Sequence, residues 1–343
     1  MRLRQRSTVA PPPQPPYPLA VRSATAYGSR ARGNEALAAL GVALALDLAC
    51  GEPPAAAHPV VGIGKLIAWS ERRAPRSAPG QLLYGAALAL GVPIGVGALA
   101  ACAERVAEPL PTPARVLLLG AALKPAFALR ALLGAGARLQ GLLEHDDLPA
   151  ARREVRALVS RDTSALDGGL LAAAAIESLA ENLTDSVVAP LLAYALGDLP
   201  AAYAYRAVNT LDSMVGYRGR YEWLGKAGAR LDDAANLLAA RLSALLLSAA
   251  APAIGASPRA ALAGMRRDRR ATASPNAGWT MAAAAGALNV RLEKRGHYVL
   301  NGAAPEPTPA DIARARRLVA VASCGAALVA AGVALARRRA ACR

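Results

Sequence analysis

The sequence predicts an all-α, polytopic integral membrane protein of roughly five transmembrane or membrane-embedded helices with long polar helical loops. Of the 343 residues, 54% are hydrophobic, and the mean hydropathy of +0.27 is high for a soluble protein. Apolar runs recur at the length that spans a bilayer. No stretch alternates apolar and polar residues in the way that indicates β-strands.

The N-terminal region differs in composition from the rest of the chain. Residues 1–34, with "PPPQPPYP" and scattered arginines, predict a disordered, basic, proline-rich extension. This extension lacks the apolar core of a cleavable signal peptide. Residues 35–340 are predicted to form a single membrane domain, in which 144–235 is the main site-bearing segment. Its first apolar run, 36–50, is short and reads as a retained anchor.

Four later runs complete the predicted spans. Residues 82–103 carry no charge and would extend about 33 Å as a helix, which is enough for a bilayer core. Residues 318–336 are also uncharged and precede three consecutive arginines, a stop-transfer pattern. Residues 237–256 carry only Arg241, near one end, where its side chain can reach the interface. Residues 116–143 carry three cations and give a weaker signal.

The net charge of +16 raises the alternative of a nucleic-acid-binding protein. The cations flank apolar runs, however, and only 4% of the residues are aromatic, which leaves few side chains for base stacking. Basic loops on an anionic membrane surface explain the charge better. We therefore expect a lipid bilayer, and no nucleic acid, as a partner. The four cysteines form no CxxC pair, which argues against a zinc site or a disulfide framework.

The segment "IESLAENLTDS" (176–186) places Glu177, Glu181 and Asp185 four residues apart. Each four-residue step advances about 40° around a helix, so the three acids share one face. Like charges at this spacing weaken a helix, and charges within a membrane cost several kcal/mol. A cation or amine site offsets this cost, so we assign the three acids, with Asp212, to catalysis. The alternative is a structural polar stripe that faces a water-filled groove.

A second acidic group, Asp232, Asp233 and Asn236, lies on a predicted helix. Its carboxylate and amide oxygens suit Mg²⁺ that carries phosphate. The alternative is a solvated helix start, where aspartates favour the macrodipole. The glycine-rich, basic turn before this group, "GYRGRYEWLGK" (216–226), can hold phosphate oxygens or face lipid headgroups.

Two local patterns precede the acidic segment, and several nucleotide and catalytic motifs are absent. The stretch "LPAARREVRALV" (148–159) predicts a short amphipathic helix. "RDTSALDGG" (161–169) then predicts a turn, with Ser164 and Asp167 as a capping pair for the acidic helix. "GRYEWLGKA" (219–227) has five residues between its glycines and no Ser or Thr after its lysine, so it is not a P-loop. G-x-S-x-G and H-E-x-x-H are also absent.

Several ordered motifs now identify a family resemblance. "HPVVGIGKLI", "RDTSALD", "IESLAENLTDSVVAPLLAYALGDL", "VNTLDSMVGYRGRYEWLGKAGARLDDAANLLAARL" and "SPNAGWTMAAAAGALNVRL" closely resemble the adenosylcobinamide-phosphate synthase family, integral membrane proteins of cobalamin (vitamin B12) biosynthesis. The match runs in order from about residue 40 to 335. Two departures stand out: Glu52 in "CGEPP" replaces the aspartate of a usual Gly-Asp-Pro, and "LEKRGHYVLNG" is less glycine-rich than its counterparts.

The resemblance implies an amide-bond-forming ligase in the cell (inner) membrane that joins adenosylcobyric acid to aminopropanol phosphate or a related amino alcohol. It implies ATP as cosubstrate, and Mg²⁺ is our hypothesis for offsetting phosphate charge. The expected partners are the corrinoid, the amino alcohol phosphate and the bilayer, and other corrinoid-pathway enzymes are further candidates. We expect the site to face the cytoplasm.

The remaining site residues are predicted as two sets. Substrate binding is assigned to His58, Arg161, Asp162, Asn182, Asn209, Ser213, Arg218, Arg220, Lys226 and Asn276, and Mg²⁺ binding to Asp232, Asp233 and Asn236. Three other functions stay open: an intramembrane Mg²⁺-dependent prenyl- or phosphotransferase, a membrane transporter, and a scaffold for neighbouring pathway enzymes. Conversion of adenosylcobyric acid only in the presence of the amino alcohol phosphate would distinguish the ligase from all three.

Overall fold

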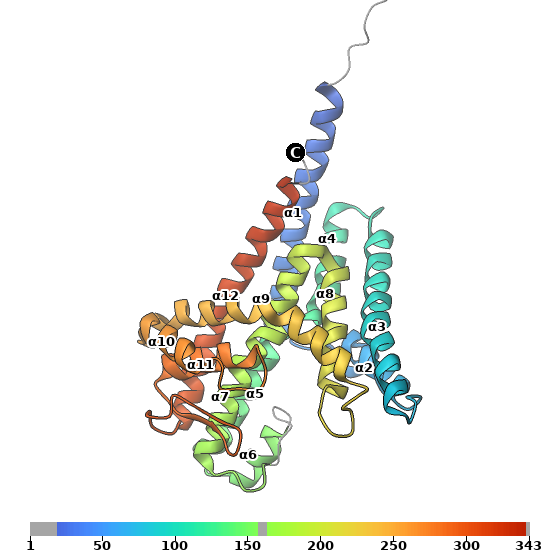
Figure 1. Ribbon diagram of the computed structural model, residues 1–343. Coiled ribbons are helices and arrows are strands. Elements are labelled where there is room, and N and C mark those ends of the chain that lie inside the picture. Colours follow the sequence, from blue (N-terminus) through green and yellow to red (C-terminus); the bar gives the residue numbers. More distant parts are fainter. Residues whose placement is uncertain (1–18, 157–162, 341–343) are drawn as a thin grey trace, which may run out of the picture.

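The computed structural model describes residues 19–156 and 163–340, and it confirms the predicted helical class (Figure 1). Five stretches are long and apolar enough to cross a membrane: Ala78–Ala107, Thr112–Glu144, Gly168–Val215, Lys226–Ile254 and Pro309–Ala340. The chain is therefore a multi-pass membrane protein. The predicted run 36–50 is not among these five stretches, and its place is taken by Gly168–Val215, which contains the acidic helix.

The elements follow one another in a simple order. They are α1 (Leu19–Cys50), η1 (Ala55–Ala57), α2 (Pro59–Glu71), α3 (Ala78–Ala107), α4 (Thr112–Leu123), η2 (Lys124–Ala126), α5 (Leu129–Glu144), α6 (Leu148–Val155), α7 (Gly168–Leu183), the π-helix η3 (Thr184–Val188), α8 (Ala189–Val215), α9 (Lys226–Ala250), η4 (Ala251–Ile254), α10 (Pro258–Asp268), α11 (Ala277–Leu288), β1 (Leu292–Lys294), β2 (Tyr298–Leu300) and α12 (Pro309–Ala340).

Helix α1 begins earlier than the sequence predicts. It starts at Leu19 and so includes 19–34, which the sequence analysis assigned to a disordered extension. The physical reason is composition: no proline follows Pro18 before the end of α1, and the alanine-rich stretch favours a helix. Residues 1–18, with the proline run, lie outside the described residues.

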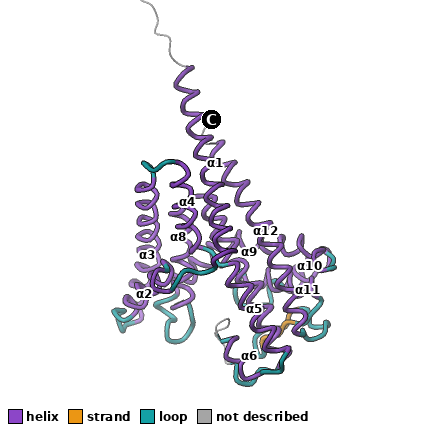
Figure 2. The backbone as a smooth tube through the Cα atoms, turned by 180° about the vertical axis from the view of Figure 1, so that it is seen from behind, coloured by secondary structure: helices purple, strands orange, loops and turns teal. Residues whose placement is uncertain are grey.

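The stretch Gly168–Val215 is a helical hairpin rather than one straight rod. The π-helix η3 joins α7 to α8, and α8 itself contains a turn at Gly197 and Asp198, where the backbone is not helical. Asp198 has φ 56° and ψ −154°, and Pro200 opens the returning helix. The chain therefore runs up through α7 to this turn and comes back beside α3 (Figures 1 and 2).

Helix α9 has a different direction from its neighbours. It crosses α8 and α12 rather than running alongside them in both views (Figures 1 and 2). Its buried side chains include Asp232 and Asn236, whereas Leu237, Leu238 and Leu245 are exposed. Helix α9 therefore turns a polar face towards the interior of the protein and an apolar face outwards.

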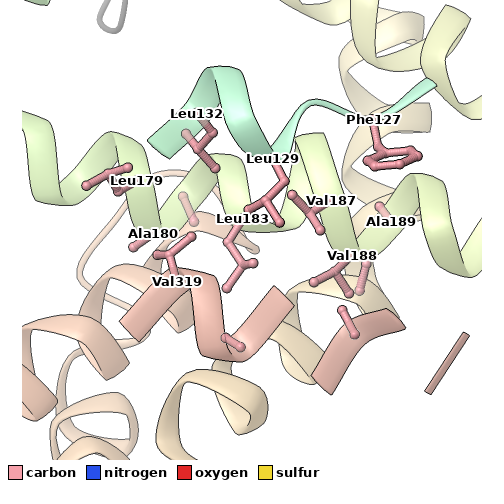
Figure 3. Close-up of a cluster of buried hydrophobic side chains, with 14 of the residues drawn as sticks. Phe127, Leu129, Leu132, Leu179, Ala180, Leu183, Val187, Val188, Ala189 and Val319 are labelled. Atoms are coloured by element: carbon pink, nitrogen blue, oxygen red, sulfur yellow. The ribbon is translucent and has the colours of Figure 1, made fainter. Parts of the chain in front are cut away.

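A tightly packed cluster of buried hydrophobic side chains includes residues of the π-helix η3 (Figure 3). Phe127 (1% exposed) precedes α5 and lies in this cluster with Val187 and Val188 of η3. The backbone N–H of Ala128 donates to the carbonyl of Ser186 at 2.9 Å. Dense packing of this kind leaves few alternative positions for a helix. The cluster therefore fixes the segment that carries Asp185.

Two short-range predictions need correction. The absence of strands is wrong at residues 292–300, where β1 and β2 pair antiparallel with Leu292 opposite Leu300. Strands of three residues are too short to show an alternating pattern. The capping pair is also wrong, because Asp167 itself caps α7 by accepting the N–H of Leu170 at 2.9 Å. The predicted amphipathic helix is confirmed over Leu148–Val155 as α6, and 157–159 lie outside the described residues.

Candidate functional site

A cavity of about 180 Å³ lies between α7, η3, α8, α9 and α11. In the part of the chain that the structure describes, its walls carry five carboxylates and no lysine or arginine side chain. The lining residues are Glu181, Thr184, Asp185, Asp212, Ala229, Asp232, Asp233, Asn236, Ala240, Ser274, Asn276, Ala277 and Thr280. We call this cavity the acidic pocket. It brings together three of the four predicted catalytic residues and all three predicted metal ligands.

Four of the carboxylates have no hydrogen-bond or ion-pair partner among the described residues. Within the described ranges, the side chains of Glu181, Asp185, Asp212 and Asp233 make no hydrogen bond or ion pair. Glu181 is exposed although it lies in the last turn of α7, within the stretch Gly168–Val215, because its side chain opens into the acidic pocket. Negative charges so placed repel one another and attract any cation that enters.

The fifth carboxylate, Asp232, is held by a chain of hydrogen bonds. Its Oδ1 accepts from Asn209 Nδ2 at 3.3 Å, and its Oδ2 accepts from Asn236 Nδ2 at 3.0 Å. Asn236 Oδ1 in turn accepts from the hydroxyl of Tyr205 at 3.0 Å. Helix α9 begins at Lys226, so Asp232 is one full turn inside the helix. The solvated helix-start interpretation is therefore wrong for Asp232, which is 8% exposed.

Arg206 supplies the cation behind this network. Its Nη1 donates to Asn209 Oδ1 at 3.2 Å and to the backbone carbonyl of Asp185 at 3.1 Å. Arg206 does not line the acidic pocket. Its charge therefore orients the amide that holds Asp232 without occupying the space in front of the carboxylates.

The predicted magnesium ligands do not form a ready-made cage. Asn236 uses its carbonyl oxygen to accept from Tyr205 and points its amide nitrogen at Asp232. Across the described part of the chain, no three His, Cys, Asp or Glu side chains are close enough to hold one metal ion. Mg²⁺ commonly keeps several waters and uses one or two carboxylates with substrate phosphates. The oxygen donors of the acidic pocket fit such a partly hydrated ion, with Asp212 and Asp233 as its two carboxylates.

Four predicted residues on α7 and α8 lie outside the acidic pocket. Glu177 is 4% exposed and does not line it, because each four-residue step turns the helix by about 40° and Glu177 lies one turn farther away. Asn182 donates to the Ser178 carbonyl at 3.0 Å, and the hydroxyl of Ser213 donates to the Asn209 carbonyl at 2.8 Å. Asn209 acts on the pocket only through Asp232.

The basic turn also stays away from the acidic pocket. Arg218 and Arg220 are exposed, and Arg220 pairs with Glu71 of α2 at 3.1 Å. Lys226 lies with its ammonium 4.9 Å from the Trp223 ring. None of the three cations lines the pocket. If they bind phosphate, they do so outside its walls.

His58 belongs to a separate charged network. Its Nδ1 accepts from the N–H of Val60 and caps α2, and its Nε2 lies 2.8 Å from Glu52. Glu52 also pairs with the buried Lys124, which contacts Asp47 at 3.2 Å. In this structure His58 therefore has a capping role. The predicted residues Arg161 and Asp162 lie outside the described residues.

Asn276, which was predicted to bind substrate, lines the acidic pocket and links two helices. Its Nδ2 donates to the Asp233 carbonyl at 2.8 Å, and its Oδ1 accepts from Arg241 at 2.7 Å. The Arg241 guanidinium lies 4.6 Å from the centre of the Trp279 ring. Arg241 therefore turns inward instead of reaching the interface. The contact of Arg241 with Asn276 and that of Tyr205 with Asn236 were not predicted, because neither Arg241 nor Tyr205 belongs to a spaced motif.

Comparisons with known proteins complete the description. The family model described as CobD/Cbib protein matches residues 40–319. The curated relatives include proteins named cobalamin biosynthesis protein CobD from Dehalococcoides mccartyi (40% identical, covering 85% of this chain and 95% of the relative), Rhodobacter capsulatus (44%, 84% and 94%) and Mycobacterium tuberculosis (41%, 83% and 91%). No solved structure matches the chain.

Proposed function

Because this chain belongs to the CobD/Cbib family and is a multi-pass membrane protein of cobalamin biosynthesis, we propose that it is an amide-bond-forming ligase. Its substrates are adenosylcobyric acid and aminopropanol phosphate or a related amino alcohol. The products are adenosylcobinamide phosphate, or its analogue, with ADP and inorganic phosphate. ATP serves as the cosubstrate that activates the carboxylate.

The acidic pocket is the observation that carries this proposal. Among the described residues, four carboxylates without a hydrogen-bond or ion-pair partner and one amide-anchored carboxylate face a single small cavity whose walls hold no lysine or arginine. Unpaired charges within an apolar protein cost several kcal/mol unless a cation compensates them. An ammonium group of the amino alcohol has the charge and the size to do so.

The chemistry requires an amine that has lost its proton and a carboxylate that carries a leaving group. The carboxylate of adenosylcobyric acid attacks the γ-phosphate of ATP to give an acyl phosphate and ADP. The amine nitrogen then attacks the acyl carbon, and phosphate leaves with the C–O bonding electrons. Glu181 is placed to receive the amine proton, because its side chain opens into the pocket and makes no hydrogen bond within the described chain.

The other pocket residues bind the ammonium group and Mg²⁺ and hold the pocket walls in place. The chain Tyr205–Asn236–Asp232 fixes one carboxylate as an acceptor, so Asp232 can hold an ammonium N–H in a defined direction. Asn276 ties the Asp233 backbone to α11 and keeps the two walls together. Asp212 and Asp233 are the carboxylates placed to hold Mg²⁺, which would offset the charge of the transferred phosphate.

The distribution of cations supports a cytoplasmic pocket. Arginines and lysines are dense in segments 72–76, 152–156, 218–230, 259–270 and 291–295. The C-terminal end of α12 and the α3–α4 connection lie together at the other end of the molecule, away from the turn that joins α8 to α9 (Figure 1). That other end carries Arg337, Arg338 and Arg339 at the end of α12, whereas the five segments above carry eighteen arginines and lysines, and this excess of positive charge favours the cytoplasmic side for the pocket end. We therefore place the enzyme in the inner membrane with its pocket towards cytoplasmic ATP.

The conversion of adenosylcobyric acid by purified protein tests this function directly. Product should form only when the amino alcohol phosphate, ATP and Mg²⁺ are all present. Asp233→Asn keeps the shape of a pocket carboxylate but removes its charge, and it should abolish most turnover. Glu222→Gln, in the exposed α8–α9 turn, is the matched control and should keep full activity. Amide formation that is unaffected by Asp233→Asn and independent of ATP would overturn the proposal.

A further inference from the structure

A second cavity, of about 380 Å³, lies on the other side of α8 from the acidic pocket. It is almost wholly apolar, and its walls come from α2, α3, α4 and α8. Its lining residues are Pro59, Gly62, Ile63, Leu66, Val96, Leu99, Ala100, Ala103, Ala122, Leu199 and Tyr203. The hydroxyl of Tyr203 is already used, because it donates to the Ala122 carbonyl at 2.7 Å. We call this cavity the apolar groove.

The apolar groove opens onto a surface that faces lipid. Leu99 lines the groove and is 72% exposed, and Leu66 on the facing helix is also exposed. The same helix α3 exposes Leu90 and Ile94 and is one of the five stretches able to span a membrane. In a bilayer, acyl chains surround such a surface, so the groove is continuous with the lipid-facing side of the protein.

A polar cavity of about 310 Å³ adjoins the apolar groove, and Leu199 lines both. Four carboxylates line the polar cavity: Glu35, Glu104, Glu108 and Asp198. Two arginines, Arg115 and Arg338, also line it, and Arg337 pairs with Asp198 at 2.5 Å. Arg115 pairs with Glu35 at 2.5 Å, and Arg338 pairs with Asp198 at 2.6 Å. The described lining residues, four carboxylates and two arginines, therefore have a formal charge of −2, which disfavours an anionic ligand and suits one that carries an ammonium as well as a phosphate.

The shape of the groove is fixed in advance by helix α2, which is held at both ends. His58 caps its first turn and pairs with Glu52. At the other end, Glu71 accepts from the Tyr221 hydroxyl at 2.7 Å, and this hydrogen bond raises the pKa of Tyr221. A preformed apolar cavity of this volume with polar groups at one end is typical of a ligand site.

We propose that the apolar groove binds one acyl chain of phosphatidylethanolamine and that the adjoining polar cavity holds its zwitterionic headgroup. The chain buries apolar surface against α2, α3 and α8. The ammonium lies among the carboxylates, and the phosphate lies near the arginines. This lipid site is separate from the acidic pocket and does not depend on the proposed reaction.

A photoreactive phosphatidylethanolamine with a diazirine in its acyl chain tests this site. The full-length protein is reconstituted in nanodiscs that contain this lipid, irradiated and digested, and the labelled peptides are identified by mass spectrometry. Labels should concentrate on α2 and on 96–103 of α3. Phosphatidylglycerol with the same diazirine chain should label these peptides much more weakly.

Groove-filling variants provide the decisive comparison. A Cβ built on Gly62 meets no atom within 4 Å, so this position has room for a side chain that enters the groove, and Gly62→Leu should remove most of the groove label. Ala103→Leu fills it from the opposite wall and serves as the second variant. Gly95→Leu is the matched control, because Gly95 also has open space around it but does not line the groove.

Two results would overturn the proposal. Labelling of α2 and α3 that survives both folded groove-filling variants would show that the lipid merely coats the outer surface. Equal groove labelling by phosphatidylglycerol would refute the headgroup assignment. Retention of the wild-type elution volume and thermal midpoint by each variant establishes that it is folded.

Discussion

Replacing Glu181 by Gln should make the ligand-free protein more stable while it removes activity. The change keeps the shape of the side chain and deletes one of five negative charges around the acidic pocket. Ordinary core substitutions act in the opposite direction, because most of them lower the free energy of unfolding. The sign of the change in the free energy of unfolding therefore distinguishes a ligand site from acids that have only a structural role.

The size of the effect follows from the dimensions of the pocket. A cavity of 180 Å³ has the volume of a sphere about 7 Å across, so carboxylates on opposite walls lie roughly 7–10 Å apart. At an effective dielectric constant of about 20, two such charges repel by about 2 kcal/mol, and in water by less than about 1 kcal/mol. Removal of one charge should therefore raise the free energy of unfolding by about 1–2 kcal/mol in the absence of ligand.

Thermal unfolding in detergent, followed by tryptophan fluorescence, measures this change. Mg²⁺ or ethanolamine should stabilise the wild type, by about 2.7 kcal/mol at a ligand concentration 100 times Kd. The same ligands should stabilise Glu181→Gln less, since part of the attraction is gone. Glu222→Gln should match the wild type in both respects, because its side chain is exposed outside the pocket. A less stable Glu181→Gln protein with undiminished ligand response would refute the reasoning.

Three further predictions concern other parts of the molecule. Tyr205→Phe removes the hydroxyl that bonds Asn236 and leaves a buried amide oxygen unpaired, so kcat should fall roughly tenfold, or about 1.4 kcal/mol, with KM little changed; an unchanged kcat would contradict the positioning role. Asp198→Ala should lower the thermal midpoint more than Asp198→Gly, because glycine tolerates the positive φ at this turn, and the reverse order would contradict the strain. Glu222→Cys, with the native cysteines replaced by serine, should react with an impermeant maleimide only from the cytoplasmic side, and labelling from outside would invert the proposed orientation.

The helical fold class and most of the membrane-spanning segments were predictable, because they depend on the composition of successive parts of the chain. Long uncharged runs at 82–103 and 318–336 cross a bilayer whatever their neighbours are, and the structure has α3 and α12 there. The run 36–50 is helical as part of α1, but α1 is not among the five stretches, and its start at Leu19 lies inside the segment that was predicted to be disordered. The turn at Gly197 and Asp198 was also missed, although Gly197, Asp198 and Pro200 are residues typical of a helix break.

The acidic residues were identifiable from sequence as expensive groups in an apolar setting. Glu181 and Asp185 were singled out for that reason, and Asp232 as a possible Mg²⁺ ligand; each lines the acidic pocket. Their convergence was not identifiable, since it depends on how α7 and α9 cross. The exclusion of Glu177 likewise follows from helix rotation and packing, which spacing alone does not fix.

The sequence by itself determined that this protein is a helical membrane protein of cobalamin biosynthesis with charged groups that need compensation, because hydropathy, residue type and motif order are properties of the chain. Only the tertiary structure decided which charges share a cavity and which are already paired. In the fold, Asn236 bonds Tyr205 and Asp232, and His58 caps α2. Glu181 faces the pocket and makes no hydrogen bond or ion pair within the described chain. Hydrogen-bond partners are chosen by the distance and direction between helices, and these are set by packing across the whole fold.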